Sequence, residues 1–214
     1  MYRKDKPGLG LDAGYDRRQA VLFLTAAVLT LPGRALADSS PAMRLVDAAL
    51  AQTAHRVTYD GSYRRIPYPG GDVPADRGVC SDVVIRAYRA GLDIDLQRLV
   101  HEDMARDFAA YPKIWGLGRP DSNIDHRRVP NLETFFTRKG ARLAAPRDAA
   151  AYRPGDLVTW RLPGNLPHIG IVTERRSADG ARPLIAHNIG RGPEVSDMLF
   201  DYPVAGRFRY LPTG

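Results

Sequence analysis

The chain has 214 residues, of which 44% are hydrophobic and 26% are charged. This composition fits one globular domain of ordinary size and excludes both a disordered chain and a bundle of membrane spans. The formal net charge is +7, but no block of Lys and Arg and no RNA-binding signature accompanies it, so no nucleic-acid partner is expected. The five His are scattered and no paired-Cys or His-Glu-x-x-His spacing occurs, so neither a metal nor a cofactor is expected.

Residues 1–37 have the features of an export signal. Arg17 and Arg18 precede an apolar run over residues 20–31, and a small-x-small cleavage site ends at Ala37. The run is shorter than the roughly 20 residues of a spanning helix, so no membrane span is expected. We expect cleavage after Ala37 and a location in a bacterial periplasm or outside the cell, by the twin-arginine or the general secretory route. Cleavage would lower the net charge to +4, a mild excess that suits an anionic polymer such as cell wall.

One domain is expected over residues 38–214, and its first half reads as helices and loops. Residues 41–55 have apolar positions at helical spacing, and Ser40 before them is a suitable cap. A loop rich in Gly and Pro, residues 60–75, then leads directly to Cys80. Because long loops inside compact domains are usually functional or disordered, we expect this one to form a wall of a cleft.

Cys80 is the only cysteine in the chain and is predicted to lie in the first turn of a helix. Apolar residues recur from it at helical spacing, at Val83, Val84 and Ala87, and Gly91 is a plausible end of the helix. Unpaired N–H groups and the positive end of the helix dipole favour a thiolate at such a position. An unpaired thiol in an exported protein is either used or buried, so Cys80 is either a nucleophile or a small buried apolar residue.

Two more helices are predicted before the sequence changes character. Asp93 or Asp95 caps a helix that continues to about Phe108, and Asn131 caps a shorter one that Gly140 ends. The last third instead shows short apolar runs between Gly- and Pro-containing turns, which is typical of strands. These strands are predicted over residues 157–160, 168–173, 183–188 and 206–210. Helices followed by antiparallel strands predict an α+β fold.

Two histidines fall on neighbouring predicted strands. His168 begins one strand and His187 lies on the next, so their side chains can meet on one face of the sheet. Cys80 would then act as nucleophile and His168 as its base, with His187 or the adjacent Asn188 fixing the ring of His168. The N–H groups of Cys80 and Ser81 would stabilise the oxyanion. Two tyrosines of the preceding segment, Tyr59 and Tyr63, are candidates for the cleft wall and for a further oxyanion donor.

Sequence motifs in this region resemble those of the NlpC-type bacterial cell-wall peptidases. The motifs are the run PGDLVTW from Pro154, the run HIGIV from His168 and the apolar strand that ends at His187. The resemblance implies a papain-like fold, a Cys80/His168/His187 site and hydrolysis of amide bonds in peptidoglycan peptides. The runs YDGSY (59–63), PGGDVPADRGVC (69–80) and NIDHRRVPNL (123–132) also resemble an uncharacterised bacterial domain-of-unknown-function family related to that group.

One departure concerns the nucleophile loop. The NlpC pattern places an acid before the Cys, whereas here Asp82 follows Cys80 by two residues. We therefore expect Asp82 to be a first-turn acid of the helix, and substrate contacts made from that loop in the family are not transferred. The candidates for binding a substrate are instead Asp76, His126, Arg127 and Arg128, and Arg127 or Arg128 could hold a substrate carboxylate in a bidentate pair. An exposed basic loop is the alternative interpretation of the last three.

Three functions remain open at this point. The first is an exported cysteine hydrolase that acts on peptidoglycan peptides. The second is an acyltransferase or transpeptidase, in which an amine replaces water. The third is a wall-binding module without catalysis, which the complete Cys/His/His set makes the least favoured. The sequence does not specify the bond that is cleaved or the oligomeric state.

Overall fold

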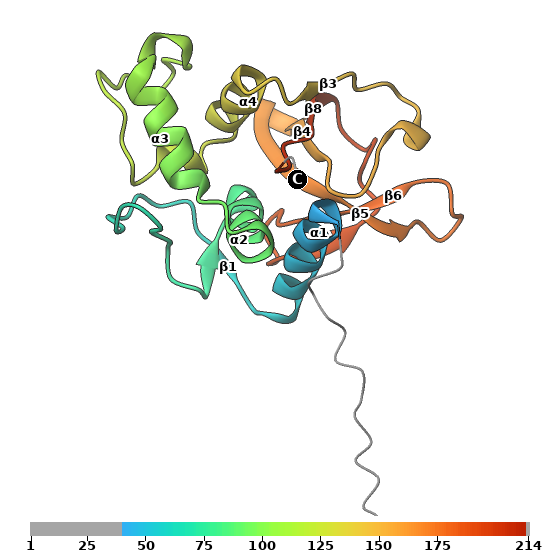
Figure 1. Ribbon diagram of the computed structural model, residues 1–214. Coiled ribbons are helices and arrows are strands. Elements are labelled where there is room, and N and C mark those ends of the chain that lie inside the picture. The colour runs from blue at the N-terminus through green and yellow to red at the C-terminus, as the bar shows by residue number, and fades with distance from the viewer. Residues whose placement is uncertain (1–39, 213–214) are drawn as a thin grey trace, which may run out of the picture. The chain divides into compact units, whose positions relative to one another are not determined.

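The computed structural model describes residues 40–212, so the predicted export signal lies outside the described residues. Four α-helices and a small pair of parallel strands come first in this part of the chain, and a larger antiparallel sheet follows (Figure 1). The helices are α1 (Pro41–Ala51), α2 (Cys80–Leu92), α3 (Leu96–Arg106) and α4 (Val129–Arg138). The strands are β1 (Thr58–Tyr59), β2 (Arg77–Gly78), β3 (Arg142–Leu143), β4 (Leu157–Leu162), β5 (Leu166–Arg176), β6 (Pro183–His187), β7 (Glu194–Ser196) and β8 (Val204–Phe208). Single-turn 3₁₀ helices are η2 (Gln52–Ala54), η3 (Phe108–Ala110), η4 (Asp125–Arg127), η5 (Ala149–Ala151) and η6 (Pro163–Asn165).

The sheet has six antiparallel strands in the order β3-β8-β4-β5-β6-β7. The turn at Pro163–Asn165 joins β4 to β5 and sets a register in which Trp160 pairs with His168. Strand β6 then returns beside β5, with Ala186 opposite Ile171. The predicted α+β fold is therefore confirmed, although β3 and β7 were not predicted because two or three residues carry too little alternation to be recognised.

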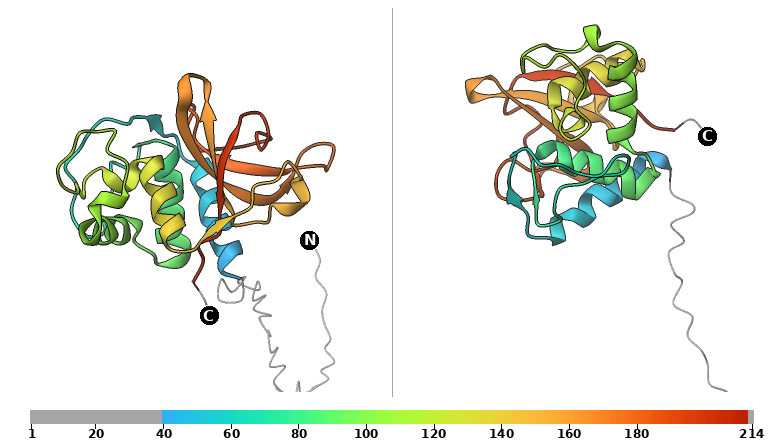
Figure 2. Two further views of the ribbon diagram at one scale, coloured as in Figure 1. Left: turned by 90° about the horizontal axis from the view of Figure 1, so that it is seen from above. Right: turned by 90° about the vertical axis from the view of Figure 1, so that its left-hand side faces the viewer.

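Both faces of the central strands are buried. The helices cover one face (Figure 2). On this face apolar residues of α1, α2 and α4 pack on Leu157, Ile171 and Phe208. The connecting segments at residues 149–152 and 198–204 cover the other face around Trp160. Helix α2 therefore lies within the core and holds its first residue, Cys80, in a fixed position. Within residues 40–212, no helix has the length and apolarity that crossing a membrane requires.

Helix boundaries follow the predictions with two corrections. Gly91 does not end α2 but lies inside it, and Asp93, in the left-handed region, ends the helix. A glycine is needed at position 91 because a Cβ there would meet the Arg44 carbonyl of α1 at 2.5 Å. Asn131 does not cap α4, which begins two residues earlier behind Arg128. Asn131 is instead buried, and its side-chain amide donates to the Asp125 carbonyl at 3.1 Å.

Candidate active site

Cys80 is the first residue of α2 and its side chain is almost enclosed, with 4% of the residue exposed. Burial raises the pKa of its thiol to about 11, and the nearby Asp82 carboxylate adds to this shift. Three groups that face the sulfur oppose the shift, namely the backbone N–H groups of Ile169 and Ser81 and the hydroxyl of Tyr59. Since Ile169 directly follows His168, the thiol lies against β5, the strand that also carries the predicted base.

The Tyr59 hydroxyl contacts both the side chain and the backbone N–H of Cys80. Burial and the proximity of the thiol raise the pKa of this phenol above its usual value, so Tyr59 remains a neutral donor. At 45% exposure, Tyr59 is the most open of the groups around the sulfur. The role of Tyr59 as a wall of the cleft stays a prediction.

His168 and His187 are both buried and their rings are in direct contact. The distance from His168 Nε2 to His187 Nδ1 is 3.1 Å, and His187 Nε2 lies 2.7 Å from Ser196 Oγ. A consistent hydrogen-bond chain has His168 donating to His187 and His187 donating to Ser196. In this tautomer His168 Nδ1 carries no proton and can act as a base, whereas the reverse direction of the same two hydrogen bonds would place a proton on it.

Gly170 makes room for this pair of rings. It lies between His168 and Val172 on β5, and a Cβ at this position would meet Ile185 at 2.5 Å and His187 Cβ at 3.1 Å. A side chain there would push β6 away and separate the two imidazoles. The Gly in the run from His168 to Val172 is thus a packing requirement of the site.

Burial lowers the pKa of three histidines, to about 3 for His168 and about 4 for both His187 and His126. Each is thus neutral in the folded protein near pH 7, but in the unfolded chain each takes up a proton as the pH falls through about 6.5. We therefore expect the free energy of unfolding to decrease between about pH 6.5 and pH 4, on the order of 3 kcal/mol for His126 alone. Chemical denaturation across this range measures the effect. In His126→Gln we expect the free energy of unfolding to fall less steeply with decreasing pH. A free energy of unfolding that does not change over this pH range in the unsubstituted chain would contradict the expectation.

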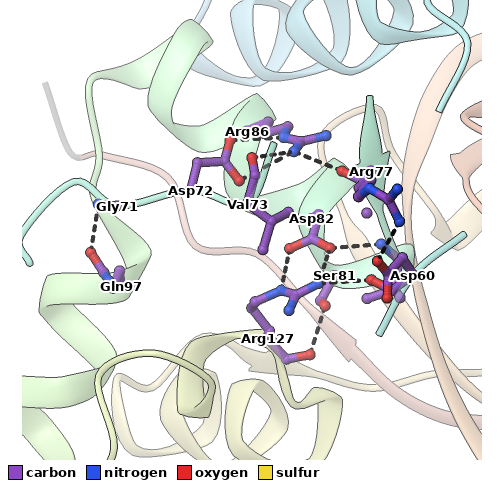
Figure 3. A network of polar contacts seen from close by, with 12 residues as sticks. Asp60, Gly71, Asp72, Val73, Arg77, Ser81, Asp82, Arg86, Gln97 and Arg127 are labelled. Atoms are coloured by element: carbon purple, nitrogen blue, oxygen red, sulfur yellow. Dashed lines mark hydrogen bonds and ion pairs between the residues drawn. The ribbon is translucent and has the colours of Figure 1, made fainter. Parts of the chain in front are cut away.

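A buried ion pair fixes the nucleophile end of α2. Asp82 accepts hydrogen bonds from Nε and Nη2 of Arg127, both at 2.8 Å, and from the Val79 N–H at 2.6 Å (Figure 3). The side chains of Asp82 and Arg127 are 3% and 2% exposed. The Ser81 hydroxyl donates to the Arg127 carbonyl at 2.6 Å. Asp82 is therefore a first-turn acid, as predicted, and it also accepts a buried guanidinium.

The same Arg127 side chain holds the segment that carries Tyr59. Its Nη2 donates to the Asp60 carbonyl at 3.2 Å and its Nη1 to the Ser62 carbonyl at 3.4 Å. The Asp60 carboxylate in turn binds Arg77, the residue before Gly78 in β2 (Figure 3). One guanidinium thus connects the Tyr59 segment, the start of α2 and η4.

Residues 46–210 match the model of a family described as a domain of unknown function, DUF1287. The chain belongs to the DUF1287 family. The uncharacterized protein YijF of Escherichia coli (strain K12) is 51% identical over 169 residues, which cover 79% of this chain and 82% of that protein. The predicted membership of an uncharacterised bacterial family is thus confirmed.

Among solved structures, NlpC1 and NlpC2 from Trichomonas vaginalis are similar to 82% of this DUF1287 chain, at 17% and 16% identity. The TM-scores are 0.44 and 0.45. This chain spans about half the length of each, 46% and 48%. The α+β architecture itself is evident from the helices and the antiparallel sheet described above.

Several predicted substrate-binding residues of the DUF1287 chain are already occupied by other contacts. Arg127 is enclosed with Asp82, so its guanidinium is not free for a substrate carboxylate. Arg128 binds Asp125 at 2.9 Å and stacks on Trp115 at 4.2 Å. His126 is 2% exposed and cannot contact a substrate. The prediction was wrong for these three residues because the loop that carries them folds inward.

Three other predicted residues make contacts that do not involve the thiol or the two histidines. The Tyr63 hydroxyl accepts a hydrogen bond from Asn123 at 3.1 Å and lines a separate cavity, so it is not an oxyanion donor. Asp76 is exposed and lines other cavities beside Arg56. Asn188 does not orient His168, since its amide donates to the Gly78 carbonyl at 3.4 Å and its oxygen accepts backbone N–H groups of the following turn.

Sequence reasoning missed Ser196, the last member of the hydrogen-bond chain. It lies on β7, opposite Ile185 of β6, so the side chain of Ser196 reaches His187 diagonally across the strands. The short run from Glu194 to Ser196 after two glycines was the available signal for an extra strand. Among residues 40–212, no cluster of His, Cys, Asp and Glu could hold a metal ion.

Proposed function

We propose that this chain is an exported cysteine hydrolase of the papain type that cleaves amide bonds in peptidoglycan peptides. The observation that carries the proposal is the hydrogen-bond chain from His168 through His187 to Ser196, on a sheet whose strand β5 contacts, through Ile169, a cysteine at a helix start. An oriented base next to a nucleophile is the arrangement that acyl transfer requires. The peptidoglycan substrate is supported by the NlpC-like motifs, by the mild positive charge and by the export signal predicted over residues 1–37.

In the proposed reaction, His168 and Cys80 carry out the first step together. His168 Nδ1 takes the thiol proton while Cys80 Sγ attacks the carbonyl carbon of the substrate. The carbonyl oxygen becomes an oxyanion, which the Cys80 N–H and the Tyr59 hydroxyl can stabilise. The intermediate then collapses, the C–N bond breaks, and His168 returns the proton to the leaving amine. Water, activated by the same nitrogen, hydrolyses the thioester and regenerates the thiol.

Incubation of the protein comprising residues 38–214 with purified peptidoglycan tests this function. We expect new primary amines and matching new carboxylates to appear with time. Because Cys80 is the only cysteine, prior treatment with iodoacetamide modifies one defined atom and is expected to stop the release. Release that continues at the same rate after complete alkylation would contradict a cysteine mechanism, and absence of release by untreated protein would contradict the substrate.

A further inference from the structure

A cavity of about 810 Å³ lies between the loop that follows Tyr59 and the segment that precedes η4. Tyr63, Arg65 and Ile66 form one wall, and residues 116–123 form another. His101 of α3 also lines it. The cavity is distinct from the enclosed position of Cys80, and none of the catalytic groups proposed above lines it.

The walls of this cavity are tied together by side chains that lie far apart in sequence. The Asn123 oxygen accepts the Ile66 N–H at 3.0 Å, and its amide donates to the Tyr63 hydroxyl at 3.1 Å. Behind them, the fully buried Gln97 donates to the carbonyls of Pro67 and Ser122, at 2.9 and 3.1 Å. Hydrogen bonds across both loops make the cavity a defined feature of the fold.

The two arginines that line the cavity are unpaired. Arg65 and Arg119 are exposed, and neither forms an ion pair with any residue that the structure describes. Nearby arginines differ, since Arg64, Arg127 and Arg128 are each paired with an aspartate. The one carboxylate of the lining, Asp121, already accepts hydrogen bonds from the backbone and the amide of Asn123, at 2.9 and 2.8 Å.

An imidazole nitrogen in the lining also lacks a partner. His101 Nδ1 is shielded from solvent and has no hydrogen-bond partner among the described residues. Guanidinium groups without an ion-pair partner, such as those of Arg65 and Arg119, are groups that bind a carboxylate. The carboxylate recognition that the sequence suggested for Arg127 and Arg128 is thus available here instead.

The chain limits the distance between this cavity and the nucleophile. Tyr59 contacts Cys80, and Tyr63 lines the cavity. Since Tyr63 follows Tyr59 by four residues, the Cα atoms of these two tyrosines are at most about 14 Å apart. Arg127 fixes the backbone between them through the carbonyls of Asp60 and Ser62. An extended peptide covers the same distance with about four residues.

We propose that this cavity binds a carboxylate of the acidic peptide whose amide bond Cys80 attacks. Arg65 and Arg119 supply the positive charge. This inference rests on the proposed function, because it assigns one end of the same substrate. It predicts a preference for peptides with a free carboxylate within about four residues of the cleaved bond.

Calorimetric titration of the mature chain with Cys80→Ala tests the inference without turnover. The probes are a peptidoglycan stem peptide with free carboxylates and the same peptide with its carboxylates amidated. We expect amidation to weaken binding by about 10-fold or more, and the double substitution R65Q/R119Q to weaken binding of the free peptide equally. In the double variant the two peptides should bind alike. Arg56→Gln, which removes an exposed arginine outside this cavity, should leave binding unchanged.

Equal binding of the two peptides by the Cys80→Ala chain would overturn the inference, as would undiminished binding by R65Q/R119Q. Failure of this inference can be distinguished from failure of the proposed hydrolase activity. Carboxylate-dependent binding together with no turnover by the unsubstituted chain would keep the subsite and refute the hydrolase. Turnover that is indifferent to amidation and to both arginines would keep the hydrolase and refute the subsite.

Discussion

Replacement of Cys80 or His168 by alanine is expected to lower turnover of peptidoglycan peptides by at least about 10³-fold. Cys80→Ala removes the attacking atom, and His168→Ala removes the nitrogen that takes its proton. Because both groups act in one step, the double variant should be no slower than either single variant. Rates of amine release at equal protein concentration compare all three.

His187 acts through His168, so its replacement is expected to have a smaller effect. His187→Ala leaves His168 Nε2 without its partner at 3.1 Å, and we expect a loss of about 10-fold or more. His187→Asn supplies an acceptor oxygen and should recover part of the rate. His55→Ala, at an exposed imidazole outside the site, should change nothing. Full turnover by the His168→Ala protein would contradict the assignment of the base.

Arg127→Met is expected to lower the free energy of unfolding by about 3–5 kcal/mol, because the substitution leaves the Asp82 carboxylate buried without its ion pair. The bonds from Arg127 to the carbonyls of Asp60 and Ser62 are lost as well. The segment that carries Tyr59 would then be held less firmly against Cys80. Unfolding in urea at a fixed pH measures the change.

Two matched variants separate the buried charge from the lost contacts. In D82N/R127M the uncompensated charge is gone, and the oxygen of the introduced amide can still accept the Val79 N–H, so we expect more stability than in Arg127→Met alone. Arg98→Met removes an ion pair to Glu102 whose arginine is 47% exposed, and should cost less than about 1 kcal/mol. An Arg127→Met protein as stable as the unsubstituted chain would show that the pair is not structural.

The parts of the structure that depend on local pattern could be predicted from the sequence. The helical spacing from Cys80 placed the nucleophile at a helix start, and the hairpin between the predicted strands 168–173 and 183–188 placed His168 beside His187. Both features follow from periodicity and turn chemistry within a few residues. The α+β order followed from the same signals.

The parts that depend on distant partners could not be predicted. Arg127 and Arg128 look identical in sequence, but only Arg127 meets Asp82, 45 residues away, and is enclosed by it. Asn188 and His187 are adjacent, and which of them faces His168 depends on where β6 ends. Gly91 reads as a helix end because its contact with α1 is invisible in a single stretch of sequence.

The rate of Cys80 alkylation by iodoacetamide as a function of pH, in the protein comprising residues 38–214 and in its His168→Ala variant, tests the Cys–His pair most directly. Burial raises the pKa of the Cys80 thiol to about 11, so reaction near pH 7 requires a neighbouring proton acceptor. We expect His168→Ala to slow alkylation near pH 7 by about 10-fold or more, with the two curves converging as the thiol ionises at high pH. Identical rates in both proteins at every pH would mean that His168 does not act on Cys80 and that the thiol is a structural core residue.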